Sequence, residues 1–112
     1  MKIKSITIIL ALISILLLSG CIGQTESQSD TDKANLACVN ECKARLDSGE
    51  DLTIGPCLLN PIPELPDWVC DVAHSPRLTD VDNLPENQCS EYGKTAKHYV
   101  EVDPRCGLIR TV

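Results

Sequence analysis

The sequence predicts a small, disulfide-rich α+β domain: one N-terminal helix packed on a short antiparallel sheet that ends in a C-terminal β-hairpin. Three observations predict it, namely a helical pattern over residues 34–48, two alternating segments around a turn-forming run at residues 103–107, and an even set of six cysteines. Aromatic residues make up 3% of the chain and Phe is absent. Burial of aliphatic side chains alone would therefore leave so small a domain marginally stable.

Residues 34–48 have the pattern of an amphipathic helix. Asp32 is suited to cap the first turn, and Gly49 suits the left-handed stop after the last one. Three aliphatic residues recur at helical spacing and are expected on the buried face: Leu36, Val39 and Leu46.

The segments after this helix are predicted from their prolines and from alternation. Residues 55–67 contain four prolines, which lack the amide donor that a helix or a central strand needs, so we expect an extended surface connection there. Residues 68–74 alternate as a strand, and a second turn-rich stretch follows them. Residues 97–102 and 108–112 flank the turn-forming run, which predicts a terminal hairpin.

The N-terminus has the pattern of an export signal. Lys2 and Lys4 precede a nearly unbroken apolar run over residues 6–18. As a helix this run would span about 20 Å, whereas the hydrocarbon core of a bilayer is roughly 30 Å thick. A permanent transmembrane helix is therefore not expected.

The apolar run ends in the motif Leu18-Ser19-Gly20-Cys21, which resembles the lipobox of prokaryotic lipoproteins at all four positions. The resemblance implies that Cys21 receives a lipid, that the chain is cut just before it, and that the mature protein starts there. It also implies a lipid-anchored location on the extracytoplasmic face of the cell membrane. The alternative is an ordinary cleaved signal whose leftover cysteine carries no lipid.

Three regions are predicted: a lipoprotein signal peptide at residues 1–20, a flexible tether at 21–33, and a disulfide-stapled globular domain at 34–112. The tether is expected to be flexible because residues 23–33 contain no aliphatic side chain. Without residues 1–20 the chain has 8 basic and 16 acidic residues, a formal charge of −8. This acidic balance disfavours nucleic acid as a partner, and no cofactor is expected.

Six cysteines lie in the predicted domain, and an even set in an oxidising compartment predicts three disulfides. Cys38 and Cys42 lie one helical turn apart, so we expect each to pair with a distant segment rather than with the other. Six cysteines allow fifteen pairings, and the sequence does not decide further among them. The other four cysteines are Cys57, Cys70, Cys89 and Cys106. The tight Cys-x₂-Cys pairs of metal sites and thiol redox catalysts are absent. The helical Cys-x₃-Cys resembles the cysteine-stabilised αβ scaffold of defensin-like peptides, but the Cys-x-Cys strand of that family is missing, so the resemblance implies no activity.

His74 and His98 are the two histidines of the chain. With Asp71 they could form a metal site or an acid–base pair if their strands are neighbours. The plainer interpretation is that they are partly exposed strand residues bonded to nearby loops, since no His-x₃-His spacing supports a metal. Ser75 follows His74 but lacks the Gly-x-Ser-x-Gly turn of a nucleophilic serine.

Two further features have competing interpretations. Trp68 is expected to pack against a disulfide in the core, and a recognition surface is the alternative. The acidic run at residues 80–82 is expected to be solvated charge, since it lacks the pattern of an EF-hand loop.

The leading functional hypothesis is a membrane-anchored extracytoplasmic lipoprotein with a small non-catalytic binding or structural domain. It rests on the lipobox-like Cys21, the expected disulfides and the lack of a catalytic motif. The alternative is a small surface metal-binding protein or enzyme that uses His74, His98 and nearby acids, for which those side chains must converge. The protein or envelope partner is left open.

Overall fold

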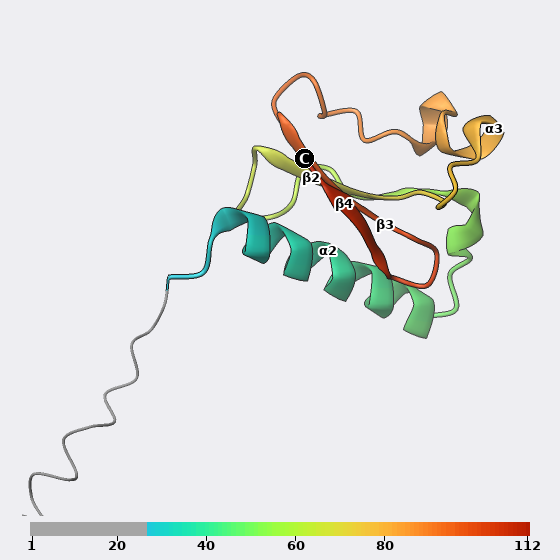
Figure 1. Cartoon of the computed structure of the whole chain (residues 1–112), viewed down its shortest axis with the longest axis horizontal. Helices are drawn as coiled ribbons and strands as arrows, with labels where there is room; N and C mark the ends of the chain where they lie inside the picture. Colours follow the sequence, from blue (N-terminus) through green and yellow to red (C-terminus); the bar gives the residue numbers. More distant parts are fainter. Residues whose placement is uncertain (1–26) are drawn as a thin grey trace, which may run out of the picture.

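The computed structural model describes residues 27–112 and confirms a small α+β fold with one long helix, a four-stranded sheet and three disulfides. Helix α2 (Asp30–Asp47) lies along one face of the sheet, and the chain between β2 and β3 lies on the other side (Figure 1). The strands are β1 (Cys57–Leu59), β2 (Trp68–Val72), β3 (His98–Val102) and β4 (Leu108–Thr111). Three short helical turns complete the fold: η1 (Leu52–Ile54), α3 (Thr79–Asp82) and η2 (Pro85–Asn87). The predicted signal peptide and Cys21 lie outside the described residues.

The sheet is mixed, so the prediction of an antiparallel sheet was wrong. Its strand order is β1-β2-β3-β4, with antiparallel pairs at both edges and a parallel pair, β2 and β3, in the middle. The parallel pair runs in register from Trp68 beside His98 to Val72 beside Val102. Residues 73–97 carry the chain back to the starting end of the sheet, which is the crossover that a parallel pair requires.

Strands β3 and β4 pair antiparallel around the predicted turn at residues 103–107. The Asp103 carboxylate accepts hydrogen bonds from the backbone N–H groups of Arg105 and Gly107, at 2.8 and 2.9 Å. An aspartate that bonds its own turn in this way is a common turn-forming device. A Cβ atom on Gly107 would lie 2.7 Å from an Asp103 carboxylate oxygen, so a larger residue here would require the Asp103 side chain to move.

Helix α2 starts at Asp30, four residues before the predicted start, and includes the last residues predicted for the tether. Ser29 caps it in place of the expected Asp32, whose backbone N–H donates to Ser29 Oγ at 3.2 Å. The end is as predicted, because Gly49 has a left-handed backbone with φ of +85°. Within residues 27–112, none of the helices has both the length and the apolar character needed to cross a membrane.

The buried face of α2 agrees with the prediction only at Val39, which is partly buried against the core. Leu36 is 52% exposed and Leu46 is also exposed, whereas Ala34, Cys38 and Cys42 are fully buried. These three residues recur every four positions and form a single stripe. The helix therefore meets the sheet through small side chains and disulfides, which allow a close approach, and its leucines stay outside the contact.

The three disulfides connect the helix and the crossover segment to the sheet. They are Cys38–Cys70, Cys42–Cys106 and Cys57–Cys89. Cys38 and Cys42 each pair with a distant segment, as predicted. The main core between α2 and the sheet is built around two of these bonds and consists of aliphatic residues and Trp68: Ala34, Leu52, Leu58, Ile62, Val72, Val100 and Val102, with Trp68 at the rim.

The proline-rich stretch at residues 55–67 was predicted to be an extended surface connection, and this prediction was only partly correct. Strand β1 lies within it, and Leu58 and Ile62 are buried in the main core. The prolines flank β1 rather than interrupt it, since Pro56 precedes the strand and Pro61 follows it. Arg45 of α2 fixes this strand by donating a hydrogen bond from Nη2 to the Leu58 carbonyl oxygen at 2.7 Å.

Candidate functional site

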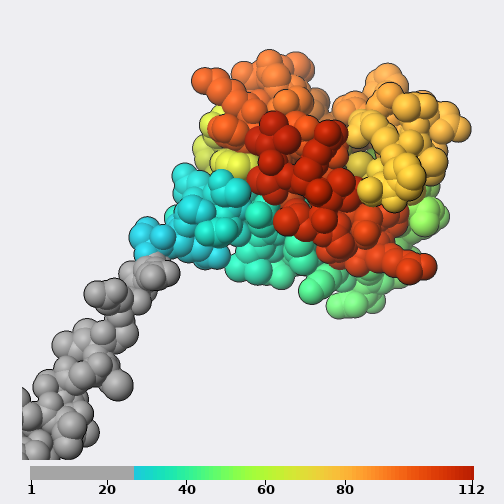
Figure 2. All heavy atoms as spheres, viewed as in Figure 1, coloured from blue at the N-terminus to red at the C-terminus, as the bar shows by residue number. Residues whose placement is uncertain are grey.

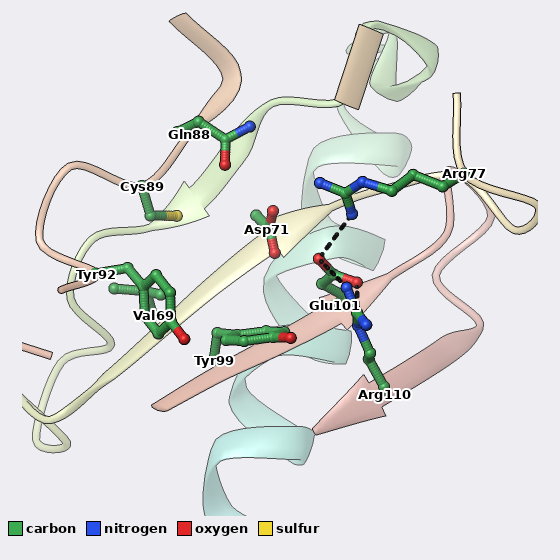
Figure 3. Close-up of a pocket in the computed structure, with 9 residues that line it drawn as sticks. All are labelled: Val69, Asp71, Arg77, Gln88, Cys89, Tyr92, Tyr99, Glu101 and Arg110. Atoms are coloured by element: carbon green, nitrogen blue, oxygen red, sulfur yellow. Dashed lines mark hydrogen bonds and ion pairs between the residues drawn. The ribbon is translucent and has the colours of Figure 1, made fainter. Parts of the chain in front are cut away.

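The face of the sheet turned away from α2 carries a group of polar side chains. Residues alternate between the two faces along a strand, and Val72 and Val102 belong to the core beneath the helix. Their neighbours Asp71 and Glu101 therefore point to the opposite face, where they stand side by side in the parallel β2–β3 register (Figure 3).

These side chains form the floor of an open pocket of about 410 Å³. Its walls come from the crossover segment and from the neighbouring strands β3 and β4. The lining residues are Val69, Asp71, Arg77, Gln88, Cys89, Tyr92, Tyr99, Glu101 and Arg110. Figure 2 shows a hollow between the yellow and orange parts of the crossover segment, next to the red C-terminal strand.

The Cys57–Cys89 disulfide holds one wall of the pocket against the sheet. Cys89 packs in a second, smaller cluster on this face with Val69 and Ala96, and Tyr99 lies against the same cluster. The bond therefore connects edge strand β1 to the crossover segment beside the pocket. A short loop is thus fixed in place even though it lies outside the main core.

Glu101 is the buried anion of the pocket, with a side chain only 7% exposed. Arg110 donates to it from Nε at 2.8 Å and from Nη2 at 3.4 Å, and Arg77 donates from Nη1 at 3.3 Å. Through the first of these bonds, Glu101 raises the pKa of Arg110. Two guanidinium groups thus neutralise one carboxylate, as a buried charge requires.

Asp71 lies next to Glu101 but lacks such partners. No hydrogen bond from residues 27–112 reaches its half-buried carboxyl group. Burial, followed by the negative charge of Glu101, raises the pKa of Asp71 to about 7. The group is therefore close to half protonated at neutral pH, an unusual state for a carboxyl group and one that is typical of functional sites.

Tyrosines form the wall beside Asp71. The Tyr92 and Tyr99 rings meet edge to face with their centroids 5.0 Å apart. The Arg110 guanidinium lies 5.4 Å from the centroid of the Tyr99 ring, within the range of a cation–π contact. The pocket therefore combines an aromatic wall, a neutralised ion network and one free carboxyl group (Figure 3).

No protein-family model, curated protein or solved structure matches this chain. The chemistry of the pocket residues is therefore the basis for assigning it a function. Among residues 27–112, no group of three or more His, Cys, Asp or Glu side chains is arranged to hold a metal ion.

His74 and His98 lie on neighbouring parallel strands or their extensions, but at opposite ends. His98 is in register with Trp68, whereas His74 lies two residues beyond Val72. Six residues along a strand correspond to roughly 20 Å, so the two imidazoles and Asp71 do not converge as the alternative hypothesis requires.

Each histidine has a separate local partner. His98 stacks on Trp68 with ring centroids 4.6 Å apart, and its Nε2 lies 3.4 Å from a carboxylate oxygen of Asp67. Trp68 itself is buried in the cluster that contains the Cys38–Cys70 disulfide, as expected.

Asp82 is buried, so the prediction that residues 80–82 are solvated charge was wrong for this residue. It accepts hydrogen bonds from the backbone N–H groups of His74 and Leu78, at 3.0 and 2.8 Å, and lies 2.8 Å from His74 Nδ1. Burial raises the pKa of Asp82, but these hydrogen bonds outweigh it and hold the pKa below its usual value. Asp82 therefore closes the loop after β2 and orients His74.

Ser75 lies beside His74 in a second, shallower concavity of about 540 Å³. Among the described residues no hydrogen bond joins the Ser75 side chain to the His74–Asp82 pair. The structure does not give Ser75 the contacts of an activated nucleophile.

Sequence reasoning named Asp71 only as a companion of the histidines and missed the rest of the pocket. One signal was available: in residues 97–102 the valines alternate with Tyr99 and Glu101, which marks a polar strand face opposite the core. Arg77 gave no signal, because it comes from a turn-rich segment whose position depends on the whole crossover.

Proposed function

We propose that this chain is a lipid-anchored extracytoplasmic protein whose domain binds a small polar ligand in the Asp71 pocket, without catalysing a reaction on it. The observation that carries the proposal is the contrast between two adjacent carboxyl groups. Glu101 is neutralised by Arg77 and Arg110, whereas Asp71 lacks a partner among the described residues. A free carboxyl group at the floor of an otherwise satisfied pocket is available to a ligand.

The pocket has the general features of a small-molecule site. Its volume of about 410 Å³ falls in the range of ligand pockets. Five of its nine lining residues are charged or amide side chains, so the pocket is more polar than most ligand sites and suits a polar ligand. The Cys57–Cys89 disulfide supports preorganisation, because it holds one wall in place before any ligand arrives.

Binding is favoured over catalysis because the reactive groups of the pocket are already engaged. Glu101 has both oxygens bonded to arginines, and Cys89 is oxidised. Asp71 would have to act without a second free acid or base from the described residues, whereas acid–base catalysis in hydrolytic sites commonly uses a pair.

The anchoring part of the proposal is supported by the lipobox-like motif at Cys21 and by the three disulfides, which are typical of proteins outside the cytoplasm. Intact-mass analysis of the protein extracted from membranes of a prokaryotic host tests it. We expect a chain that starts at an acylated Cys21 with all six other cysteines oxidised, and a Cys21→Ser variant without lipid. An uncleaved chain, or free thiols in the native material, would contradict it.

The binding part is tested by NMR on the isotope-labelled, oxidised full chain in a nonionic detergent. A panel of cationic, neutral and anionic small molecules is added, and backbone amide shifts are followed. We expect the shifts caused by a bound molecule to cluster at Asp71, Tyr99 and Glu101 and to disappear in Asp71→Asn. Asp47→Asn makes the same chemical change on exposed helix surface and should leave binding intact. A panel without any molecule that perturbs these residues would refute the pocket as a ligand site.

A further inference from the structure

The charge environment of Asp71 identifies the kind of ligand that the pocket prefers. Four ionisable groups act on it: Glu101 from β3, Arg77 and Asp82 from the crossover segment, and Arg110 from β4. Strand β1 adds none, because its one ionisable side chain, Cys57, is in a disulfide.

The two carboxylates of this set raise the pKa of Asp71 and the two arginines lower it. Glu101 raises the pKa of Asp71 by more than Arg77 lowers it, and Asp82 raises it by more than Arg110 lowers it. Arg77 and Arg110 both donate hydrogen bonds to Glu101, and among the described residues neither donates one to Asp71. The Asp71 carboxylate is therefore left without a hydrogen-bond donor among the described residues, and a positive group with N–H donors would supply one.

The aromatic wall favours the same kind of ligand. Tyr99 already has a guanidinium against its ring, and Tyr92 is 47% exposed at the edge of the same pocket. The faces of tyrosine rings attract cations, and more strongly where water is partly excluded. A positive group placed on Asp71 would lie beside these rings.

We propose that the pocket binds a small organic cation with N–H donors, a protonated amine, with its ammonium group on the Asp71 carboxylate and its carbon body against Tyr92 and Tyr99. This inference rests on the proposed ligand-binding function and specifies its ligand class. The ammonium group supplies the hydrogen-bond donors that Asp71 lacks and forms a charge-assisted pair with it. Glu101 stays with its arginines and keeps the floor of the pocket rigid.

The pairing has a definite pH dependence. The ammonium needs an ionised Asp71, so binding at lower pH must first release the proton of this group. With a pKa of about 7 for Asp71, the affinity should rise about tenfold between pH 6 and pH 8 and then level off. An anionic ligand would show the opposite trend, because ionised Asp71 repels it.

The test uses three probes of matched size: benzylamine, which is cationic, benzyl alcohol, which is neutral, and benzoate, which is anionic. Each is titrated at pH 6 and pH 8 into the oxidised full chain and into Asp71→Asn and Asp47→Asn, with amide shifts as the measure of binding. The side-chain carboxyl ¹³C shift of Asp71 is recorded with and without benzylamine. Asp71→Asn removes only a poorly solvated charge and should fold.

We expect benzylamine to bind at Asp71 and Tyr99, more tightly at pH 8, and to lower the pKa of Asp71; Asp71→Asn should lose this binding and Asp47→Asn should keep it. If benzyl alcohol or benzoate binds the pocket as tightly as benzylamine, or if the affinity for benzylamine falls with rising pH, the ligand class is overturned while the binding function stands. If no probe perturbs the pocket, the amine inference is overturned. The wider panel of molecules then decides separately whether the pocket binds any ligand.

Discussion

Asp71 and Glu101 occupy equivalent positions on two parallel strands, in register, yet only Glu101 is paired with arginine. Two carboxyl groups side by side cannot both be charged without a counterion. The structure resolves this by neutralising one of them and leaving the other with a pKa of about 7.

Asp71 should lower the stability of the free protein at high pH. Its pKa is about 7 in the folded state and 3.8 in the reference state, so between these values the folded chain binds more protons than the unfolded chain. The free energy of unfolding should therefore fall as pH rises from about 4 to about 7. Asp71→Asn should be about 2 to 4 kcal/mol more stable than the wild type at pH 8 and similar to it at pH 4.

Urea denaturation across this pH range measures the effect. The Asp47→Asn variant should follow the wild-type curve, because Asp47 is exposed at the end of α2. An Asp71→Asn curve parallel to that of the wild type would show that Asp71 titrates normally.

Glu101 should stabilise the fold, whereas Asp71 should destabilise it at high pH. Glu101→Gln leaves Arg77 and Arg110 without their shared anion and should destabilise the fold by about 1 to 3 kcal/mol. It should also lower the pKa of Asp71, because the largest charge that raises it is gone and the arginines are free to turn to it. Carboxyl ¹³C titration of Asp71 in this variant checks the shift, and an unchanged pKa would show that burial alone sets it.

Asp82 should matter for stability at low pH. Its pKa is held below 3.8 in the folded state, so its stabilising effect is complete at neutral pH and is lost as pH falls through the folded pKa. Asp82→Asn keeps the shape but weakens the bonds to His74 and Leu78, and we expect a loss of about 1 to 3 kcal/mol at pH 7.

Thermal unfolding of the wild type and Asp82→Asn at pH 7 and pH 3 measures this contribution. The gap between the two proteins should shrink at the lower pH. A constant gap would mean that the geometry of the loop, rather than the charge of Asp82, stabilises it.

Two of the disulfides form a matched pair for comparison. Cys38–Cys70 and Cys57–Cys89 both have a sequence separation of 32, so their effect on the entropy of the unfolded chain should be equal, about 3 to 4 kcal/mol each. Replacing both cysteines by alanine should cost more for Cys38–Cys70, because both of its cysteines are fully buried in the main core.

Hydrogen exchange distinguishes the two double variants. Loss of Cys57–Cys89 should speed exchange mainly around Gln88 and Tyr92, at the pocket wall, whereas loss of Cys38–Cys70 should speed it throughout α2 and β2. Equal exchange patterns in the two variants would contradict separate roles for the two bonds.

Local chemistry explains what could be predicted from the sequence. The end of the main helix at Gly49 and the turn at Asp103 follow from backbone preferences of those residues. The distant pairing of Cys38 and Cys42 follows from their spacing on one helix face. The Cβ atoms of residues four apart on a helix are about 5 to 6 Å apart, farther than the roughly 3.5 to 4.5 Å of a disulfide.

Long-range packing explains which features of the fold could not be predicted from the sequence. The helix pattern placed Leu36 inside because hydrophobicity scales favour leucine, whereas the actual stripe is alanine and cysteine joined covalently to the sheet. The parallel β2–β3 pair depends on where residues 73–97 lead the chain, and the pocket depends on that same path, since Arg77 and Arg110 reach Glu101 from different segments.

The Cys42–Cys106 bond also determines how the domain would bear a mechanical load. A pull on the start of α2 and on Val112 would pass from Cys42 straight across to Cys106. Residues 43–105, with Asp71, Arg77 and Glu101, form a side loop off this route and would carry no tension. Only the part of α2 before Cys42 and strand β4, which carries Arg110, could be drawn out, so under shear Asp71 and Glu101 would stay inside a covalently closed loop.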